Sequence, residues 1–352
     1  MKNSREHSLA FVRFTISMLF HKSISLPVLG LVISLFPTLY GCESIPSQDC
    51  SFVVAEAHAT TKVTVCDTRD LRTEILDILV FNDDELQRLD CYQRMDGGWA
   101  EDFYISSQKG DKIILFYANS QHTSEDWMWI SSLSGAYKAS VSLENETRDS
   151  PVMSGILNAS AGGTYEPSLE RLSAEVILNS LCCDFAGKAY DGERLENVHV
   201  YLTNVNAESP IWKNGYDVSR FINQGRLSEE DIRLFRDPTL VMSSINGSIG
   251  KEEVECGIAL RCYENTSEQE GPGTPRTRLV IQGDIQGVTW YWPIAVKSNE
   301  TNGVASNHRH IYDVRITGKG SADPDTEIER GNIEIIADIK EWTEKEEQNI
   351  IF

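Results

Sequence analysis

The residue with the clearest chemistry is Cys42, which ends the sequence Leu39-Tyr40-Gly41-Cys42. A leucine three positions before a cysteine and a small glycine directly before it match a bacterial lipobox, although Tyr40 is larger than the usual residue between them. At such a site the thiol is acylated, and cleavage then makes the cysteine the new N-terminus. Each buried methylene of an acyl chain contributes about 0.8 kcal/mol, so two or three chains anchor a protein firmly. We predict that Cys42 is lipidated; the alternative is an ordinary secretory signal with an accidental cysteine.

The segment before Cys42 has the layout of a signal peptide. Residues 24–36 are apolar and uncharged, and Lys22 precedes them. This run is shorter than the roughly 20 residues that span a bilayer as a helix. We therefore predict that residues 1–42 are a lipoprotein signal peptide, with Met18 as an alternative start that gives a compact leader. The part that follows has no other hydrophobic run long enough to cross a membrane.

Other candidates for chemistry are weak. His308 and His310 would share one face of a strand, but no acidic residue stands beside them in a ligand pattern, so we predict no metal site. The carboxylates of residues 83–85 lack the EF-hand spacing and fit a hairpin tip better. No nucleophile, phosphate-loop or dinucleotide motif is present. We predict a protein that is not an enzyme and that uses no cofactor.

Seven cysteines remain once Cys42 is set aside, and none lies in a CxxC motif. An exported chain can form disulfides, and Cys256 could pair with Cys262 across a bend. The alternative, which we favour, is that most of these residues are small buried side chains without a disulfide. The sequence leaves their pairing open. The seven are Cys50, Cys66, Cys91, Cys182, Cys183, Cys256 and Cys262.

The chain is acidic and has enough apolar residues for a packed core. It has 352 residues, with 53 Asp and Glu against 32 Lys and Arg, and 41% of its residues are hydrophobic. Without a basic cluster, nucleic acid is excluded as a partner. Tryptophans could stack on sugars, but we expect most of them to pack in the core. The tryptophans concerned are Trp127, Trp129, Trp212, Trp290 and Trp292.

Alternation of apolar and polar residues indicates an all-β protein. Residues 112–118 (KIILFYA) are nearly all apolar, as in a strand that is buried on both faces. The other predicted strands are 76–81 and 86–92 (a hairpin), 172–178, 198–203, 253–263, 277–284, 288–296 (paired with the preceding strand through a tight turn at Gly287), 310–317 and 333–340. Antiparallel sandwiches build such patterns.

Helices are few, and a linker divides the strands into two blocks. A capping-box-like start at Ser228 predicts a short helix to about Arg236, and residues 127–133 are a second candidate. Small and turn-forming residues dominate 158–167. We therefore predict an N-terminal β-sandwich domain over residues 43–166 and a C-terminal one over 167–352.

The order of these segments resembles a known family. LDILVFNDDELQRL (76–89), KIILFYAN (112–119), PVMSG (151–155), RLSAEV (171–176), YWPIAV (291–296), NHRHIYDVRITGKGSADPD (307–325) and IEIIADIKEW (333–342) follow a lipobox. The chain resembles the fimbrillin superfamily of Bacteroidales-type (type V) fimbriae, and most of all the lipidated anchor or accessory subunits of the FimB kind. The resemblance spans nearly all of the chain after Cys42.

This resemblance implies two transthyretin-like β-sandwich domains and assembly by strand complementation, in which a strand of one subunit fills a groove in the next. It implies a lipid-anchored protein of the cell outer membrane and the fimbrium, with fimbrial stalk or accessory subunits as partners. Cys42 corresponds to the lipidation site, and residues 333–352 correspond to the donor segment of stalk subunits. The alternative function is a surface lipoprotein or tip adhesin that binds a glycan or a host protein. Anchor, accessory and tip roles are not distinguished by the sequence.

The last residues carry a separate prediction. Ile350, Ile351 and Phe352 follow a charged stretch, whereas a free C-terminus is normally polar and frayed. Three large apolar residues at an exposed sheet edge would promote aggregation, so we expect them to be covered. The cover is either the protein's own C-terminal domain or the groove of a neighbouring subunit, for which they are donor-strand candidates.

Overall fold

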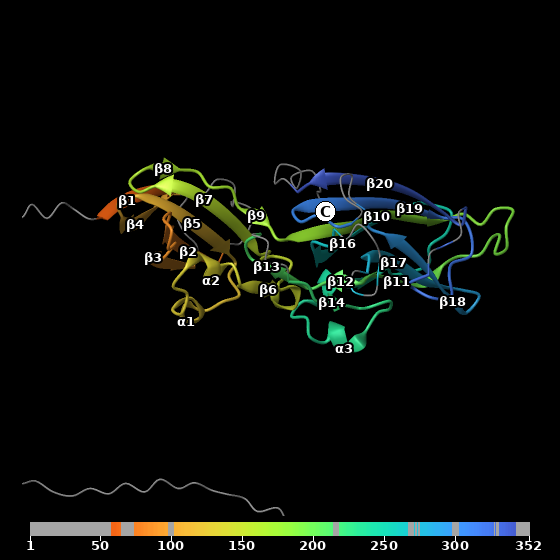
Figure 1. Ribbon diagram of the computed structural model, residues 1–352. Coiled ribbons are helices and arrows are strands. Elements are labelled where there is room, and N and C mark those ends of the chain that lie inside the picture. The colour runs from red at the N-terminus through yellow and green to blue at the C-terminus, as the bar shows by residue number, and fades with distance from the viewer. Residues whose placement is uncertain are drawn as a thin grey trace, which may run out of the picture. The chain divides into compact units, whose positions relative to one another are not determined.

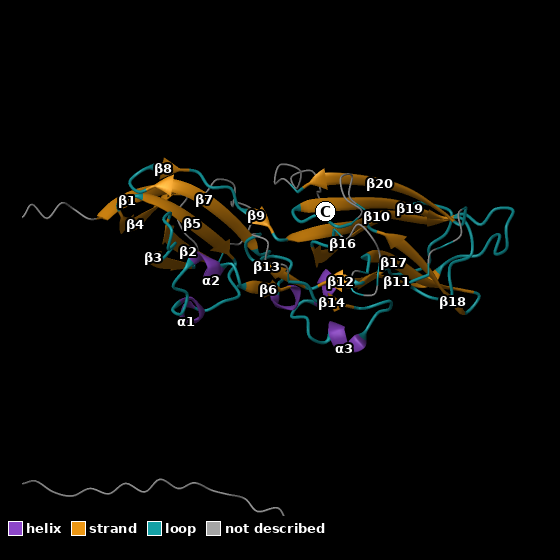
Figure 2. Cartoon of the chain, viewed as in Figure 1, coloured by secondary structure: helices purple, strands orange, loops and turns teal. Residues whose placement is uncertain are grey.

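The computed structural model describes residues 58–64, 74–97, 102–213, 218–266, 271, 273, 275–297, 303–326, 328 and 331–342. These residues belong to one compact unit. They form an all-β fold of several sheets with a few short helices (Figure 2), which confirms the predicted fold class. Within this part of the chain, no helix combines the length and apolar character needed to span a membrane.

The strands nearer the N-terminus form two packed sheets (Figure 1). The larger sheet has the order β3-β2-β5-β7-β9, and the smaller has the order β4-β1-β8. Their bounds are β1 (His58–Thr64), β2 (Ile75–Asn82), β3 (Leu89–Asp96), β4 (Asp102–Gln108), β5 (Asp111–Ala118), β7 (Met153–Ser160), β8 (Thr164–Tyr165) and β9 (Glu170–Arg171). An apolar cluster that includes Ile78, Ile105 and Phe116 fills the space between the two sheets.

Strands β2 and β5 are buried on both faces, as the apolar run predicts for β5. Alternate residues of β2, such as Ile78 and Leu79, therefore belong to two different apolar clusters. The predicted return strand of the β2–β3 hairpin begins at Leu89 rather than Leu86. The carboxylate of Asp84 accepts hydrogen bonds from the backbone N–H of Leu86 (2.9 Å) and Gln87 (2.8 Å), which holds these residues in the turn.

The C-terminal strands form a sandwich of two four-stranded sheets, with orders β16-β10-β19-β20 and β15-β11-β17-β18. Their bounds are β10 (Ser173–Cys183), β11 (Glu196–Thr203), β15 (Met242–Ser244), β16 (Val254–Tyr263), β17 (Arg278–Ile285), β18 (Val288–Ala295), β19 (His308–Ile316) and β20 (Ile333–Glu341). The β17–β18 turn contains Gln286 and Gly287, both with positive φ, as a two-residue hairpin turn requires. Most ladders are antiparallel, but β10 pairs in parallel with β19, and β1 with β8.

The predicted helix over 127–133 is wrong. Two single turns are present instead, α1 (Ser124–Trp127) and α2 (Leu133–Ala136). Between them the chain pairs with the β2–β3 turn, because Leu89 donates a backbone hydrogen bond to Ser131 (3.1 Å) and Leu133 donates one to Gln87 (3.0 Å). Tertiary pairing thus replaces the helical hydrogen bonds.

The helix predicted from Ser228 exists but is short. α3 covers Glu229–Ile232, and the Ser228 hydroxyl accepts from the N–H of Asp231 at 3.2 Å. The remaining short elements are β6 (Ser140–Ser142), β12 (Val205–Asn206), β13 (Glu208–Pro210), β14 (Phe221–Ile222) and the 3₁₀ turns η1 (Leu143–Asn145) and η2 (Pro238–Leu240).

One apolar cluster continues across the predicted domain boundary. It includes Tyr117 and Trp127 from before residue 166 and Trp212 from after it. The indole N–H of Trp212 also donates to the backbone carbonyl of Phe116 at 3.1 Å. Part of the predicted linker is strand, since β7 extends to Ser160 and residues 164–165 form β8. The division into two domains at residue 166 stays a prediction.

Candidate functional site

The predicted site residues Cys42, Ile350, Ile351 and Phe352 lie outside the described residues. Of the predicted donor segment, residues 333–352, the described part is β20 and Trp342, and β20 pairs with β19 of the same chain. The candidate surface for partner binding is therefore the part of the C-terminal sandwich beside β20, from which the tail departs.

β20 lies at the end of its sheet order, and no other described strand pairs with its outer edge. Its sequence predicts one apolar face, but that face is poorly covered. Ile335 is 41% exposed, and Ile336, on the opposite face, is 72% exposed. Two large apolar side chains on a free edge strand mark a surface that natural proteins normally protect.

A groove runs between β20 and β18, the strand at the corresponding edge of the facing sheet. Its volume is about 420 Å³. We call it the β18–β20 groove. Its apolar lining includes Ile294, Tyr312, Ile328, Ile333, Ile335 and Ile339, and Lys297, two residues after the end of β18, also lines it. This arrangement can take an extended segment with apolar residues at alternate positions.

Trp342 fixes the point where the tail begins. Its backbone N–H donates to the carbonyl of Asn307 at 2.8 Å. Its ring contacts three guanidinium groups. The Cζ atoms of Arg171, Arg261 and Arg309 lie 4.3, 5.2 and 5.7 Å from a centroid of the Trp342 ring. Cation–π contacts of this kind are favourable when they are shielded from water, and Trp342 is buried. The chain is thus held firmly directly before residue 343.

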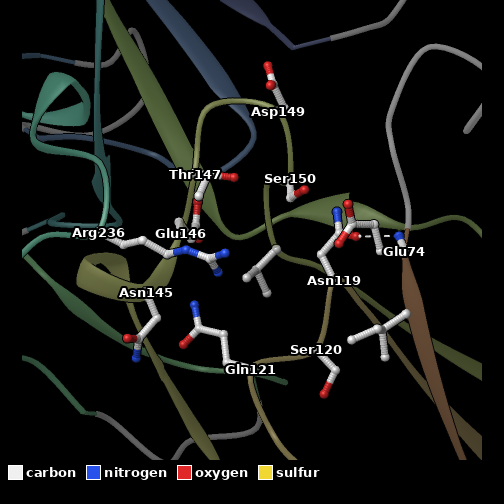
Figure 3. Close-up of a pocket in the computed structure, with 12 residues that line it drawn as sticks. Glu74, Asn119, Ser120, Gln121, Asn145, Glu146, Thr147, Asp149, Ser150 and Arg236 are labelled. Atoms are coloured by element: carbon white, nitrogen blue, oxygen red, sulfur yellow. Dashed lines mark hydrogen bonds between the residues drawn. The ribbon is translucent and has the colours of Figure 1, made fainter. Parts of the chain in front are cut away.

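A second hollow, which we call the seam pocket, lies where the loops after β5 and η1 meet the segment after α3 (Figure 3). Its volume is about 480 Å³. Most of its lining is polar, and Ile75 and Val152 are the apolar members. Figure 3 shows the Arg236 guanidinium extending toward the centre and Asp149 pointing away from it.

Glu146, in the wall of the seam pocket, is fully buried. Its two carboxylate oxygens accept hydrogen bonds from the hydroxyls of Tyr263 (2.7 Å) and Ser173 (3.5 Å), on β16 and β10. Burial raises the pKa of Glu146 to about 7, although Arg261 and the hydrogen bonds oppose this shift. A loop of the N-terminal strands is thereby tied to the C-terminal sandwich by a titratable group.

The two histidines, His308 and His310, lie on β19. The described residues contain no group of three or more metal-binding side chains. His310 is buried, and one ring nitrogen lies 3.1 Å from the carbonyl of Lys297. Burial lowers the pKa of His310 to about 4, so its imidazole is neutral at pH 7.

The suggested disulfide between Cys256 and Cys262 is wrong. Both residues lie on the single strand β16, six positions apart, and both thiols are free. A strand rises about 3.3 Å per residue, so their separation far exceeds the span of a disulfide. Cys91, Cys182 and Cys183 are also free. Cys50 and Cys66 lie outside the described residues.

The tryptophans divide as the core-packing interpretation predicts, with one exception. Trp127, Trp212 and Trp292 are buried, and Trp290 is half-buried beneath the ammonium of Lys319. Trp129 is 87% exposed. It is the tryptophan in the described part that is free to stack on a ligand.

The fold is shared with several solved structures. A protein from Bacteroides eggerthii inferred to act in cell adhesion aligns with a TM-score of 0.64 and 14% identity, over 81% of this chain and 96% of that one. A fimbrilin from Porphyromonas gingivalis aligns with a TM-score of 0.58 and 13% identity, over 81% and 97%. The C-terminally truncated tip fimbrial protein Mfa3 from the same species aligns with a TM-score of 0.51 and 12% identity, over 81% and 99%.

No protein-family model matches the chain, and no curated protein matches it. The structural similarities establish a β-sandwich fold like that of these adhesion and fimbrial proteins.

Proposed function

We propose that this protein is a non-enzymatic subunit of a surface fimbria, anchored to the outer membrane by a lipid on Cys42. In this role it is an anchor or accessory subunit that attaches a strand-complemented fimbria to the cell. The fold similarity to a fimbrilin and to a tip fimbrial protein supports a place in such a fimbria.

The observation that carries the proposal is the C-terminal edge of β20, which no other described strand pairs with. β20 exposes Ile335 and Ile336 and leads, through the fixed Trp342, into a tail that ends in three apolar residues. Backbone hydrogen bonds from a free strand edge and apolar pockets beside it are what strand addition uses. We propose that residues 343–352 help to join the protein to the fimbrial shaft.

The tail is tested by deleting residues 343–352. The proposal requires a folded, membrane-bound protein that no longer retains fimbriae, measured as fimbrial protein shed into the medium. A matched pair refines the test: Ile350, Ile351 and Phe352 are replaced together by serine, while Lys345, Glu346 and Glu347 are replaced together in the control. If the deletion unfolds the protein, the tail covers its own domain; if fimbriae are retained normally, the proposal fails.

The anchor is tested at the cysteine itself. Cys42→Ala should abolish fatty-acid labelling and release the protein from the membrane fraction, whereas Cys50→Ala should change neither. Labelling that persists in Cys42→Ala would refute the assignment.

A second candidate function is a surface lipoprotein or tip adhesin that binds a glycan or a host protein. The exposed Trp129 is the feature that favours it, because an exposed indole ring can stack on a sugar or pack against a partner protein. Sheared fimbriae from wild-type and gene-deletion cells distinguish the two functions. A subunit co-purifies with fimbriae, while a free lipoprotein stays with the membrane.

A further inference from the structure

Two amide side chains in the wall of the seam pocket, Asn119 and Gln121, are already hydrogen-bonded within the protein. The Asn119 amide donates to the carbonyl of Pro151 (2.8 Å) and accepts from the N–H of Glu74 (3.1 Å). The Gln121 amide forms two hydrogen bonds with the backbone of Ser142, at 2.9 and 3.0 Å. These two side chains are therefore held in place before any ligand binds, which lowers the entropic cost of binding.

Arg236 differs from these walls. Its backbone N–H donates to the carbonyl of Glu144 at 2.8 Å, which places the residue at the rim. Its guanidinium, however, makes no hydrogen bond or ion pair with any residue in the described part of the chain, and it points into the pocket (Figure 3). Nearby arginines do have carboxylate partners: Arg220 lies 2.9 Å from Glu144, and Arg233 lies 2.9 Å from Glu229.

A free guanidinium in a hollow favours a planar anion. Its N–H groups match a carboxylate in a two-point contact, which gives direction as well as charge attraction. The carboxylates that line the pocket do not pair with Arg236, since Glu146 is turned to Tyr263 and Ser173, Asp149 points away, and Glu74 lies on the far side of the pocket. A carboxylate brought by a ligand would fit this position.

The rest of the lining indicates what carries this carboxylate. Asn145, Thr147 and Ser150 offer an amide and two hydroxyl groups around the same space, and Ile75 and Val152 add a small apolar surface. Hydroxyl-rich ligands are held by such closely spaced donors and acceptors, while their C–H faces contact the apolar part. A volume of about 480 Å³ accommodates one or two sugar rings.

We propose that the seam pocket binds a sugar acid, of the uronate or sialate class, with its carboxylate on Arg236 and its hydroxyls on Asn145, Thr147 and Ser150. This inference is independent of the fimbrial role, because the pocket and the tail use different residues. Its failure would leave the fimbrial proposal in place, and the reverse also holds.

The experiment measures binding of D-glucuronic acid and N-acetylneuraminic acid to the purified full chain by saturation-transfer NMR and calorimetry, with D-glucose and acetate as reference ligands. At least one sugar acid should bind saturably, with a Kd on the order of 1 mM for so small a ligand. Glucose, which lacks the carboxylate, and acetate, which lacks the hydroxyls, should bind at least tenfold more weakly.

Two variants test the assigned residue. Arg236→Gln should weaken binding of the sugar acid at least tenfold, and Arg233→Gln, an exposed arginine three positions away on the same segment, should leave it unchanged. The proposal is overturned if neither acid binds saturably, if both variants weaken binding equally, or if acetate binds as tightly as the sugar acid. Glucose binding that does not depend on Arg236 would also overturn it.

Discussion

Strands β2 and β20 carry similar apolar content but have opposite surroundings. In β2, every residue from Leu76 to Phe81 is buried. In β20, five consecutive residues from Glu334 to Asp338 are exposed, including Ile335 and Ile336. β2 lies inside its sheet, between β3 and β5, whereas β20 ends its sheet.

The difference shows that burial is decided by neighbours more than by the strand's own residues. β2 gains a sheet on one face and a second apolar cluster, with Trp127 and Leu133, on the other. Among the described strands, β20 has a partner on one side only, and its apolar face lines a groove. The contrast is therefore between a central strand, covered on both faces, and an edge strand whose outer side is paired with no other described strand.

The largest effect is expected from a substitution in the buried core around β2. Trp127 is buried among apolar residues, and its indole N–H donates to the buried carboxylate of Asp77 at 2.9 Å. Trp127→Ala should therefore lower the free energy of unfolding by about 3–5 kcal/mol. The control is Trp129→Ala, two residues away, where the ring is exposed and the change should stay within about 0.5 kcal/mol. Urea denaturation measures both, and equal losses would contradict the described packing.

A pair of isoleucines compares the two strands directly. Ile78→Ala, in β2, should cost about 2–5 kcal/mol because it leaves a cavity in a closed core. Ile336→Ala, on the outer face of β20, should cost less than about 0.5 kcal/mol in the isolated protein. If Ile336→Ala is as damaging as Ile78→Ala, that face of β20 is covered by another part of the protein.

The sequence predicts most of the strands because alternation records which face is apolar. For β19, the predicted face of His310, Tyr312, Val314 and Ile316 is buried. For β20, the alternate residues from Ile333 to Ile339 share one face, as predicted, and this face lines the β18–β20 groove. The same pattern does not reveal that the face is poorly covered. Alternation of apolar and polar residues identifies the apolar face of a strand. Whether that face is buried depends on residues far away in the sequence.

The seam pocket was beyond prediction from the sequence for the same reason. Its walls come from residues 74–75, 119–121, 145–152 and 236, which no local motif connects. Arg236 follows α3 in the sequence, and it is brought to the pocket by long-range contacts, which include its own backbone hydrogen bond to Glu144 and those of Arg148 to Asp237 and Thr239. Glu146 likewise looks like an ordinary acidic loop residue. Its burial results from Tyr263 and Ser173, more than twenty residues away in the chain.

The third prediction concerns the contact between the two regions and has the smallest expected effect. Glu146 joins a loop of the N-terminal strands to β10 and β16, with Arg261 and Tyr263 as its charged and titratable neighbours there. Its pKa is raised from 4.5 to about 7 in the folded protein. Between pH 4.5 and about 7, Glu146 is therefore protonated in the folded state and ionised in the unfolded state. Its stabilising effect is complete below pH 4.5 and is lost as the pH rises through about 7.

Glu146→Gln removes this titration while keeping a carbonyl oxygen for the Tyr263 hydroxyl. Relative to this variant, the wild-type protein should lose roughly 2–3 kcal/mol of unfolding free energy between pH 4 and pH 8. Urea denaturation at several pH values measures the difference, and Glu125→Gln, at an exposed carboxylate on α1, is the matched control. A wild-type protein that gains stability relative to Glu146→Gln over this range would show that the buried carboxylate is held in its charged form. The Arg261 contact, rather than burial, would then govern the junction between the two regions.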